Sequence, residues 1–195
     1  MALEPAGFAG AVLTGGSSTR MGVDKALLEV AGRPMVVAAA TALAEAGATE
    51  IVAVGGDLAA LRGLGLDAVP DDHPGEGPLG GVLTALRRAP TDVVVVLACD
   101  MPGVDATTVA ALLRALAAEP DADVAAASDA GRLQPITAAY RIRALPLLAE
   151  RFGAGERAVR RALEPLSVVV VEGLRPAALG DVDRPEDLPR YAHPS

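Results

Sequence analysis

The sequence predicts a three-layer α/β fold, in which a mostly parallel β-sheet lies between helices on both of its faces. Short apolar runs rich in Val, Ile and Ala alternate along the chain with longer Ala- and Leu-rich stretches of helical character. Strands and helices in this order form right-handed crossover units, which build parallel sheets. In addition, residues 93–98 are apolar without interruption, which is typical of a strand buried on both faces.

Apolar runs mark the expected strands, which are residues 8–13, 50–54, 66–69, 93–98, 124–127, 135–140 and 167–171. Amphipathic stretches between them mark the expected helices, which are residues 34–46, 79–88, 105–118, 143–152, 156–163 and 185–191. The first helix has Pro34 in its first turn and Gly47 just past its end, as helix termini favour. Asp105 is placed to cap a later helix. Because ligands bind beyond the carboxyl ends of such strands, we expect functional residues there.

The composition indicates a single domain covering residues 1–195. Hydrophobic residues make up 51 % of the chain but aromatic residues only 2 %, so the core must consist of Ala, Val and Leu. A net charge of −8 argues against general nucleic-acid binding. Cys99 is the only cysteine, which excludes an internal disulfide and fits a reducing compartment. We see no signal peptide and no bilayer-length apolar run, so we expect a cytoplasmic protein without membrane contact.

Residues 13–25, after the first expected strand, form the most informative segment of the chain. Gly15 and Gly16 lack a Cβ, so the backbone can turn sharply there and lie close to a ligand. Three hydroxyl residues follow, and Arg20 and Lys25 add positive charge to an acidic protein. Backbone N–H groups with cations beside them suit a polyphosphate. The alternative is a Gly- and Ser-rich surface turn whose two cations are merely solvated.

Two common phosphate-binding motifs do not fit this loop. A P-loop ends in Gly-Lys followed by Ser or Thr, whereas Arg20 and Met21 stand at the corresponding positions. The dinucleotide pattern G-x-G-x-x-G fails because Ser17 stands where its second glycine belongs. The pattern that remains, from Leu13 to Lys25, is L-x-G-G-x-S-x-R-M-G-x-D-K.

A second glycine-rich segment, residues 70–81, follows the third expected strand. It contains G-P-L-G-G at 77–81, a tight loop leading into a helix N-terminus, which favours anions. Its glycines also match G-x-G-x-x-G, but three prolines interrupt the segment, so we reject a dinucleotide site. Asp71 is a carboxylate in this loop and a candidate hydrogen-bond acceptor for a ligand. The alternative is an aspartate that only stabilises the turn.

The tetrapeptide C-D-M-P follows the central strand, at residues 99–102. A carboxylate at the tip of a buried strand can hold Mg²⁺, which prefers one or two carboxylates together with phosphate oxygens and water. Asp100 is therefore the candidate magnesium ligand, and the alternative is a cap on the following turn. Cys99 has no defined His or Asp partner, so we interpret it as an inert, semi-buried thiol.

The first loop, G-P-L-G-G and C-D-M-P together resemble, in this order, the motifs of the molybdenum cofactor guanylyltransferases, or MobA family. The resemblance extends from Leu13 to Leu188. It implies a Rossmann-like nucleotidyltransferase fold of the nucleotide-diphospho-sugar transferase type. It also implies that GMP is transferred from GTP to molybdenum-loaded molybdopterin with Mg²⁺, giving molybdopterin guanine dinucleotide and pyrophosphate. The implied partners are GTP, molybdopterin and proteins of molybdoenzyme maturation.

The resemblance also implies roles for individual residues. Arg20, Lys25 and Asp100 would take part in catalysis, and Asp100 would bind Mg²⁺. The nucleotide would lie against a set of loop residues, which are Leu13, Thr14, Gly15, Gly16, Gly22, Lys25, Asp71, Gly80 and Asp100. Weaker matches place residues 131–136 near the pterin, and Asp181 and Asp183 near the pterin or a second metal. Asp183 also suits the start of a last helix.

Two alternatives remain open from the sequence. A related nucleotidyltransferase using CTP or a sugar phosphate would share the fold, although the CTP-using pterin enzymes usually lack G-P-L-G-G. A nucleotide-binding module that has lost catalysis would not need Lys25 and Asp100. The family can also place an Asn after the second strand, where this chain offers only backbone and Asp57. Base recognition on that side is therefore open.

Overall fold

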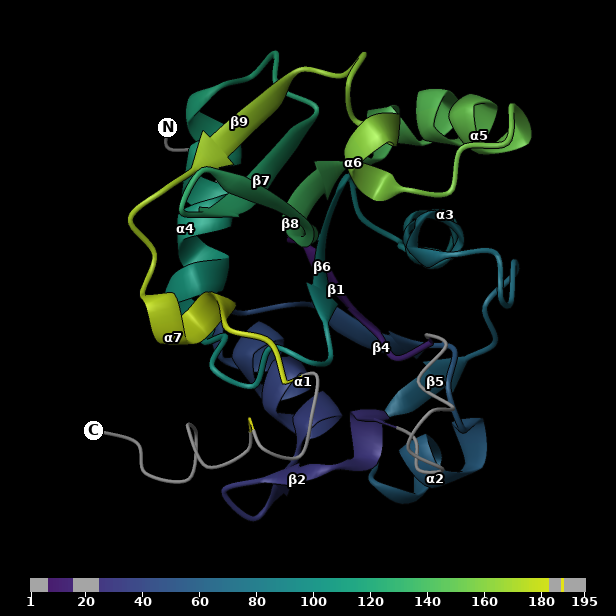
Figure 1. The fold of residues 1–195 in the computed structure, drawn as a ribbon, viewed down its shortest axis with the longest axis vertical. Coiled ribbons are helices and arrows are strands. Elements are labelled where there is room, and N and C mark those ends of the chain that lie inside the picture. The colour runs from purple at the N-terminus through teal and green to yellow at the C-terminus, as the bar shows by residue number, and fades with distance from the viewer. Residues whose placement is uncertain (1–6, 16–24, 183–186, 188–195) are drawn as a thin grey trace.

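A seven-stranded sheet forms the centre of the computed structural model, which describes residues 7–15, 25–182 and 187 (Figure 1). The strand order is β5-β4-β1-β6-β8-β7-β9. Every neighbouring pair is parallel except the two that β8 makes with β6 and β7. The strands of this sheet are β1 (Ala9–Leu13), β4 (Glu50–Val54), β5 (Asp67–Val69), β6 (Val93–Ala98), β7 (Val124–Asp129), β8 (Arg132–Arg141) and β9 (Val168–Val171). The predicted, mostly parallel sheet is confirmed.

Helices cover both faces of the sheet, which gives the three layers that the sequence predicts (Figure 1). The helices are α1 (Met35–Glu45), α2 (Leu58–Gly63), α3 (Pro78–Arg88), α4 (Ala106–Ala118), α5 (Leu145–Gly153), α6 (Val159–Ala162) and α7 (Pro176–Leu179), with short 3₁₀ turns η2 (Lys25–Leu27) and η3 (Ile142–Ala144). One core cluster joins α1, α2, α4 and α7 to the sheet, and a second joins α3, α5 and α6. Val12 belongs to the first cluster and Ala11 to the second, because successive strand residues point to opposite faces.

Strand β6 is the most deeply buried part of the sheet. Val94, Val95, Val96 and Leu97 are each at most 1 % exposed, as expected for an uninterrupted apolar strand between two helix layers. The core consists mainly of Ala, Val and Leu, and Tyr140 is its largest fully buried side chain. The Tyr140 hydroxyl donates to a backbone carbonyl of its own strand, and burial raises the pKa of this phenol.

Helix α2 and a hairpin of two short strands are among the elements that the sequence analysis does not predict. Helix α2 begins after a Gly-Gly pair, because the Asp57 carboxylate accepts hydrogen bonds from the N–H groups of Ala59 and Ala60. Strands β2 (Glu29–Val30) and β3 (Arg33–Pro34) form a small antiparallel hairpin. Its two turn residues, Ala31 and Gly32, have φ values of 51° and 76°, which is the backbone that two-residue hairpin turns require.

Several predicted boundaries shift for local reasons. Helix α6 begins only at Val159, because the Glu156 side chain binds the N–H groups of Arg157 and Ala158 in the preceding turn. Strand β8 is longer than predicted because it pairs with β7 as a hairpin, with an irregularity in the register after Ala126. Helix α7 is not predicted. The helix expected at 185–191 lies almost entirely outside the described residues.

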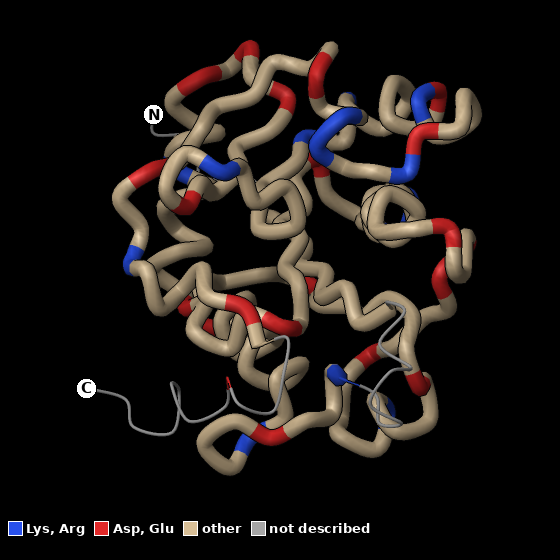
Figure 2. The backbone as a smooth tube through the Cα atoms, in the orientation of Figure 1, with Lys and Arg blue, Asp and Glu red and all other residues tan. Residues whose placement is uncertain are grey.

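The charges of the chain are distributed unevenly (Figure 2). Acidic residues are spread around the molecule, whereas basic residues gather near α6. In that region Arg157 pairs with Glu76 at 2.6 Å, and Arg161 pairs with Glu156 at 2.7 Å. Two arginines of this basic group are thus paired with carboxylates. Over the described residues, no helix has both the length and the apolar character needed to cross a bilayer.

Candidate functional site

The carboxyl ends of β1, β4, β5 and β6 lie side by side, and a predicted site residue follows each of three of them. Leu13 is in register with Val54 on one side and with Ala98 on the other, and Val54 is in register with Val69. The loops after these strands therefore start at one edge of the sheet. They carry Thr14 and Gly15, then Gly55, then Asp71, and finally Asp100. The structure thus brings these loops together as expected, while the functional role of their residues stays a prediction.

The start of the first loop is fixed to the end of β4. The Thr14 hydroxyl lies 3.0 Å from the carbonyl oxygen of Val54 and 2.8 Å from that of Gly55. The backbone N–H groups of Thr14 and Gly15 both donate to the Val54 carbonyl, at 3.0 and 3.3 Å. These two N–H groups are thus already engaged. The prediction that this loop cradles phosphate therefore depends on residues 16–24, which lie outside the described residues.

Gly55 makes the close approach of the two loops possible. Its φ is +82°, a left-handed conformation that a residue with a Cβ adopts only at a cost. A Cβ built on Gly55 would lie 3.1 Å from the Cα of Gly15, tighter than ordinary contact. A Cβ on Gly15 itself would lie 3.7 Å from its nearest neighbour, so the described protein leaves room there. The sequence analysis singled out Gly15 but gave no role to Gly55.

Lys25 and Asp100 form an ion pair at the end of β6. The Lys25 Nζ lies 3.0 Å from Oδ2 of Asp100, although the two residues are 75 positions apart in the chain. Their side chains are 13 % and 29 % exposed, so the pair is partly buried and accessible from the cavity. The backbone carbonyl of Asp100 accepts a hydrogen bond from the N–H of Val182, at 2.9 Å. The structure thus brings together two residues that the sequence analysis predicted to act on phosphate and metal.

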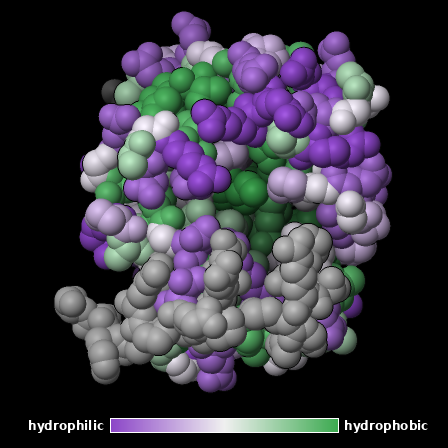
Figure 3. Space-filling view, in the orientation of Figure 1, coloured by the Kyte–Doolittle hydropathy of each residue, from purple (hydrophilic) through white to green (hydrophobic). Residues whose placement is uncertain are grey.

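A cavity of about 250 Å³ opens beside this ion pair. Its lining joins the ends of β1 and β6 to the start of α3 and to the middle of β8, and consists of Leu13, Thr14, Gly15, Lys25, Pro78, Ala98, Cys99, Asp100, Met101, Gln134, Pro135, Ile136 and Asp181. Figure 3 shows that the face seen in Figure 1 is hollowed near its middle, with hydrophobic side chains deep inside and hydrophilic ones around it. The cavity thus has a polar, charged end and an apolar wall.

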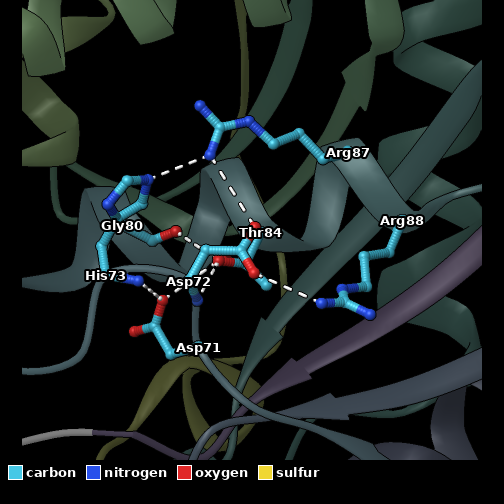
Figure 4. Close-up of polar contacts among 7 residues, drawn as sticks. All are labelled: Asp71, Asp72, His73, Gly80, Thr84, Arg87 and Arg88. Carbon is cyan, nitrogen blue, oxygen red and sulfur yellow. Dashed lines mark hydrogen bonds and ion pairs between the residues drawn. The ribbon is translucent and has the colours of Figure 1, made fainter.

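Asp71 lies in a hydrogen-bonded cluster between the loop after β5 and helix α3 (Figure 4). Its Oδ1 accepts hydrogen bonds from the His73 backbone N–H at 2.9 Å and from the Thr84 hydroxyl at 3.0 Å. The contact with His73 is the turn-stabilising bond that the alternative interpretation of Asp71 expected. Asp71 is not among the residues that line the cavity, yet it lies near Gly55, because a Cβ built there would be 3.8 Å from the Asp71 Cβ.

Gly80 has a packing role in the same region. A Cβ built on Gly80 would lie 2.7 Å from the Cβ of His73, so a larger residue would push the loop away from α3. His73 is also held by contact with the Phe152 ring, tilted by 45° with centroids 4.4 Å apart, and by Arg87, whose Nη1 lies 2.9 Å from Nε2 of the imidazole. This close packing fixes the loop that carries Asp71.

The remaining predicted residues fall into two groups. Gly16, Arg20, Gly22 and Asp183 lie outside the described residues. Asp181 lines the cavity beside the ion pair, and Cys99 is a buried residue of the same lining. Over the described residues, no group of three or more metal-ligating side chains is found.

Sequence reasoning missed two features of the site. It placed residues 131–136 near a substrate only as a weak match, whereas Gln134, Pro135 and Ile136 form one wall of the cavity. It also overlooked Thr84, which is fully buried and holds Asp71. The available signal was a hydroxyl residue in an otherwise apolar helix segment, since a buried hydroxyl needs a hydrogen-bond partner.

Comparison with known proteins connects this site to a family. Residues 10–170 match the family model described as MobA-like NTP transferase domain. The chain is 38 % identical over 165 residues to a protein of Chloroflexus aggregans named probable molybdenum cofactor guanylyltransferase, covering 82 % of this chain and 77 % of that one. A protein of Opitutus terrae with the same name is 34 % identical over 199 residues, covering 97 % of both chains.

Solved structures agree with the sequence comparison. The crystal structure of molybdopterin-guanine dinucleotide biosynthesis protein A from Archaeoglobus fulgidus superimposes with a TM-score of 0.75 at 26 % identity, covering 94 % of this chain and 96 % of that chain. The 2-C-methyl-D-erythritol 4-phosphate cytidylyltransferase of Thermus thermophilus gives a TM-score of 0.69 at 20 % identity, covering 93 % of this chain and 96 % of that one, which shows a shared fold.

Proposed function

This chain belongs to the MobA-like NTP transferase family, and from that premise we propose that it transfers GMP from GTP to molybdenum-loaded molybdopterin. The products are molybdopterin guanine dinucleotide and pyrophosphate. The observation that carries the proposal is the Lys25–Asp100 ion pair at 3.0 Å, at the charged end of a cavity that reaches from the first loop to β8. Relatives that cover nearly the whole chain and bear the name of this activity support it.

The reaction asks the protein mainly for positioning and charge stabilisation. The terminal phosphate oxygen of the pterin forms a bond to the α-phosphorus of GTP, and the bond from that phosphorus to the pyrophosphate oxygen breaks. Negative charge grows on the departing pyrophosphate. Lys25 is placed to stabilise this charge, since its ammonium lies at the cavity and carries the only positive charge among the described lining residues. Because the attacking group is a phosphate oxygen of the pterin itself, no protein nucleophile is required.

The donor set at the cavity fits Mg²⁺. Asp100 and Asp181 both line it, and Mg²⁺ typically takes one or two carboxylates, the remaining positions being filled by substrate phosphates and water. A protein site of three or more ligands is therefore not needed. We infer that Asp100 holds the ion, with Asp181 as the second available carboxylate. When bound, Mg²⁺ neutralises phosphate charge and orients the triphosphate.

The end of the cavity at the first loop is assigned to GTP, and the wall at β8 is assigned to the pterin. The triphosphate would lie against the first loop, from Leu13 through Gly15 and Gly16 to Gly22, with Lys25 at its end. Asp71 would serve the nucleoside and Gly80 would keep the loop of Asp71 close to α3. The pterin would occupy the wall formed by Gln134, Pro135 and Ile136. Arg20 is assigned to the reacting phosphates.

The cellular setting is proposed from composition. A single cysteine among 195 residues supports a reducing compartment, and we place the protein in the cytoplasm with proteins of molybdoenzyme maturation as partners. A net charge of −8, with Arg157 and Arg161 near α6 paired to carboxylates, supports a small-molecule enzyme that does not bind nucleic acid.

The proposal is tested by incubating the protein with GTP, Mg²⁺ and molybdenum-loaded molybdopterin and measuring pyrophosphate and the dinucleotide product. Parallel reactions contain CTP, ATP or UTP, and a further reaction contains a sugar phosphate in place of the pterin. We expect product with GTP and the pterin, and its loss in Asp100→Asn. Product with CTP instead of GTP would identify a cytidylyltransferase. Nucleotide binding without product under any condition would identify a non-catalytic module.

A further inference from the structure

Thr84 is a buried hydroxyl in the middle of helix α3 with three polar neighbours (Figure 4). Its Oγ1 lies 3.0 Å from Oδ1 of Asp71 and 3.0 Å from the carbonyl oxygen of Gly80. The backbone N–H of Asp72 donates to the same Oγ1, also at 3.0 Å. Thr84 thus connects the first turn of α3 to two consecutive residues of the loop after β5.

The chemistry of the hydroxyl limits how these contacts are shared. A threonine hydroxyl has one proton and two lone pairs, so it accepts from Asp72 and donates to either Gly80 or Asp71. Within a helix, donation to the carbonyl four residues earlier is the usual outcome. A carboxylate is the stronger acceptor, because hydrogen bonds to charged groups are roughly twice as strong as neutral ones. Because the two acceptors lie at the same distance, 3.0 Å, acceptor strength favours a bond from Thr84 to Asp71.

The hydrogen bond from Thr84 determines which carboxylate oxygen of Asp71 can accept a hydrogen bond from a ligand. Oδ1 accepts from both the His73 N–H and the Thr84 hydroxyl, which uses its two lone pairs. Among the described residues, Oδ2 has no hydrogen-bond partner. The Asp71 side chain lies next to Gly55, at the point where Gly55 packs closely against Gly15 and the first loop begins. One carboxylate oxygen is thus held by the protein, and the other remains available to a ligand.

We propose that Thr84 is a positioning residue for the nucleoside, because it holds Oδ1 of Asp71 so that Oδ2 alone accepts a donor of the nucleotide. The donor is a guanine N–H or a ribose hydroxyl. This inference rests on the proposed function for the identity of the nucleotide. Neither Thr84 nor Asp71 lines the cavity of the Lys25–Asp100 pair, so the contribution of Thr84 belongs to nucleotide affinity rather than to the chemical step.

The first test compares Thr84→Val, which removes the hydroxyl with little change of volume, and Thr84→Ser, which keeps it. Titration calorimetry gives the dissociation constant for GTP with Mg²⁺, and steady-state kinetics give KM and kcat. We expect Thr84→Val to raise the dissociation constant and KM for GTP about tenfold, the scale of a lost hydrogen bond to a charged group. We expect kcat to stay within about twofold and Thr84→Ser to restore affinity.

A double-mutant cycle separates positioning from structural support. In an Asp71→Ala background, Thr84→Val should leave GTP affinity unchanged, because the hydroxyl then has no carboxylate to hold. An equal loss of affinity in both backgrounds would overturn the proposal, as would unchanged affinity in folded Thr84→Val. Binding of 2′-deoxy-GTP and of inosine triphosphate to the wild type then shows whether a ribose hydroxyl or the guanine amino group meets Oδ2.

Two controls keep the test decisive. Thermal unfolding is recorded for every variant, because Thr84→Val also removes the acceptor of the Asp72 N–H. If Thr84→Val does not fold, Thr84→Ala removes the same hydroxyl and favours the helix. If wild-type protein binds GTP but makes no dinucleotide, the proposed function fails, whereas the binding cycle still decides the role of Thr84.

Discussion

The Lys25–Asp100 ion pair leads to a quantitative prediction about stability and turnover. Lys25→Met keeps the aliphatic stem of a side chain that is only 13 % exposed but removes its charge. At an effective dielectric of about 20, two unit charges 3.0 Å apart attract each other by about 5–6 kcal/mol. Desolvation offsets most of this attraction in a partly buried pair, so we expect the free energy of unfolding to fall by about 1–2 kcal/mol.

The kinetic effect of Lys25→Met should be larger than its effect on stability. Charge develops on pyrophosphate in the transition state, and loss of one positioned electrostatic group typically costs about 10²–10³ in rate. We expect the single-turnover rate at saturating GTP to fall by that factor, measured by rapid quench with labelled GTP. Asp100→Asn should lower turnover by about 10² or more and leave the fold intact, since the amide is nearly isosteric.

The double variant tests whether the pair acts as one unit. Each single substitution leaves one charge without its partner, whereas Lys25→Met with Asp100→Asn removes both. We therefore expect the double variant to be more stable than the two single effects would predict together, while its rate is no better than that of the worse single variant. Lys25→Met with a normal single-turnover rate, in a folded protein, would refute the assignment of Lys25. Normal activity of Asp100→Asn at low Mg²⁺ would refute that of Asp100.

Three further predictions concern the loops and the pH dependence. Gly15→Val should keep the fold but raise the dissociation constant for GTP about tenfold or more. Unchanged GTP affinity in Gly15→Val would mean that the nucleotide does not approach the chain at Gly15. The comparison variant Gly55→Ala, at φ +82°, should instead lower the free energy of unfolding by about 1–2 kcal/mol. Asp71→Ala should weaken GTP binding more than CTP binding in calorimetry, and equal losses would mean that Asp71 binds ribose or only holds the turn. A side-chain hydrogen bond from Arg161 lowers the pKa of Glu156 from 4.5 to about 2. The ionised Glu156 carboxylate therefore stabilises the fold fully above pH 4.5, and this contribution is lost as the pH falls toward 2. In denaturant titrations, the difference in unfolding free energy between wild type and Glu156→Gln should narrow over that pH range, and a constant difference would contradict this.

The charged end of the site could be predicted because it follows from strand order. Lys25 and Asp100 are 75 positions apart in the chain. Lys25 ends the loop after β1 and Asp100 follows β6, and both strands belong to the parallel part of the sheet. A parallel sheet brings the carboxyl ends of its strands to one edge, so a residue at the tip of β6 must lie near the loop after β1. Periodicity and turn residues in the sequence predict the parallel sheet and its carboxyl edge, whereas the pairing of β1 with β6 comes from the structure.

The supporting contacts could not be predicted in the same way. The position of Thr84 relative to Asp71 depends on how far the loop after β5 folds back onto α3, which Gly80 and His73 decide by close packing. Nothing in the periodicity of the helix reveals that distance. Likewise, the wall at Gln134 depends on the register of β8, which changes at the irregularity in its pairing with β7. Both features arise from tertiary contacts between distant segments.

The balance of charge in the cavity explains why Lys25 is paired with the Asp100 carboxylate. Among the described lining residues, Lys25 is positive while Asp100 and Asp181 are negative, so this part of the site has no excess positive charge to offer a free triphosphate. An anion would be repelled by two carboxylates, but a nucleotide that arrives as its Mg²⁺ complex meets groups suited to both of its parts. On the proposed function, the carboxylates would hold the cation and Lys25 would face the phosphates. The ion pair between Lys25 and Asp100 would then keep both groups preorganised and mutually neutralised until a ligand of mixed charge replaces each partner.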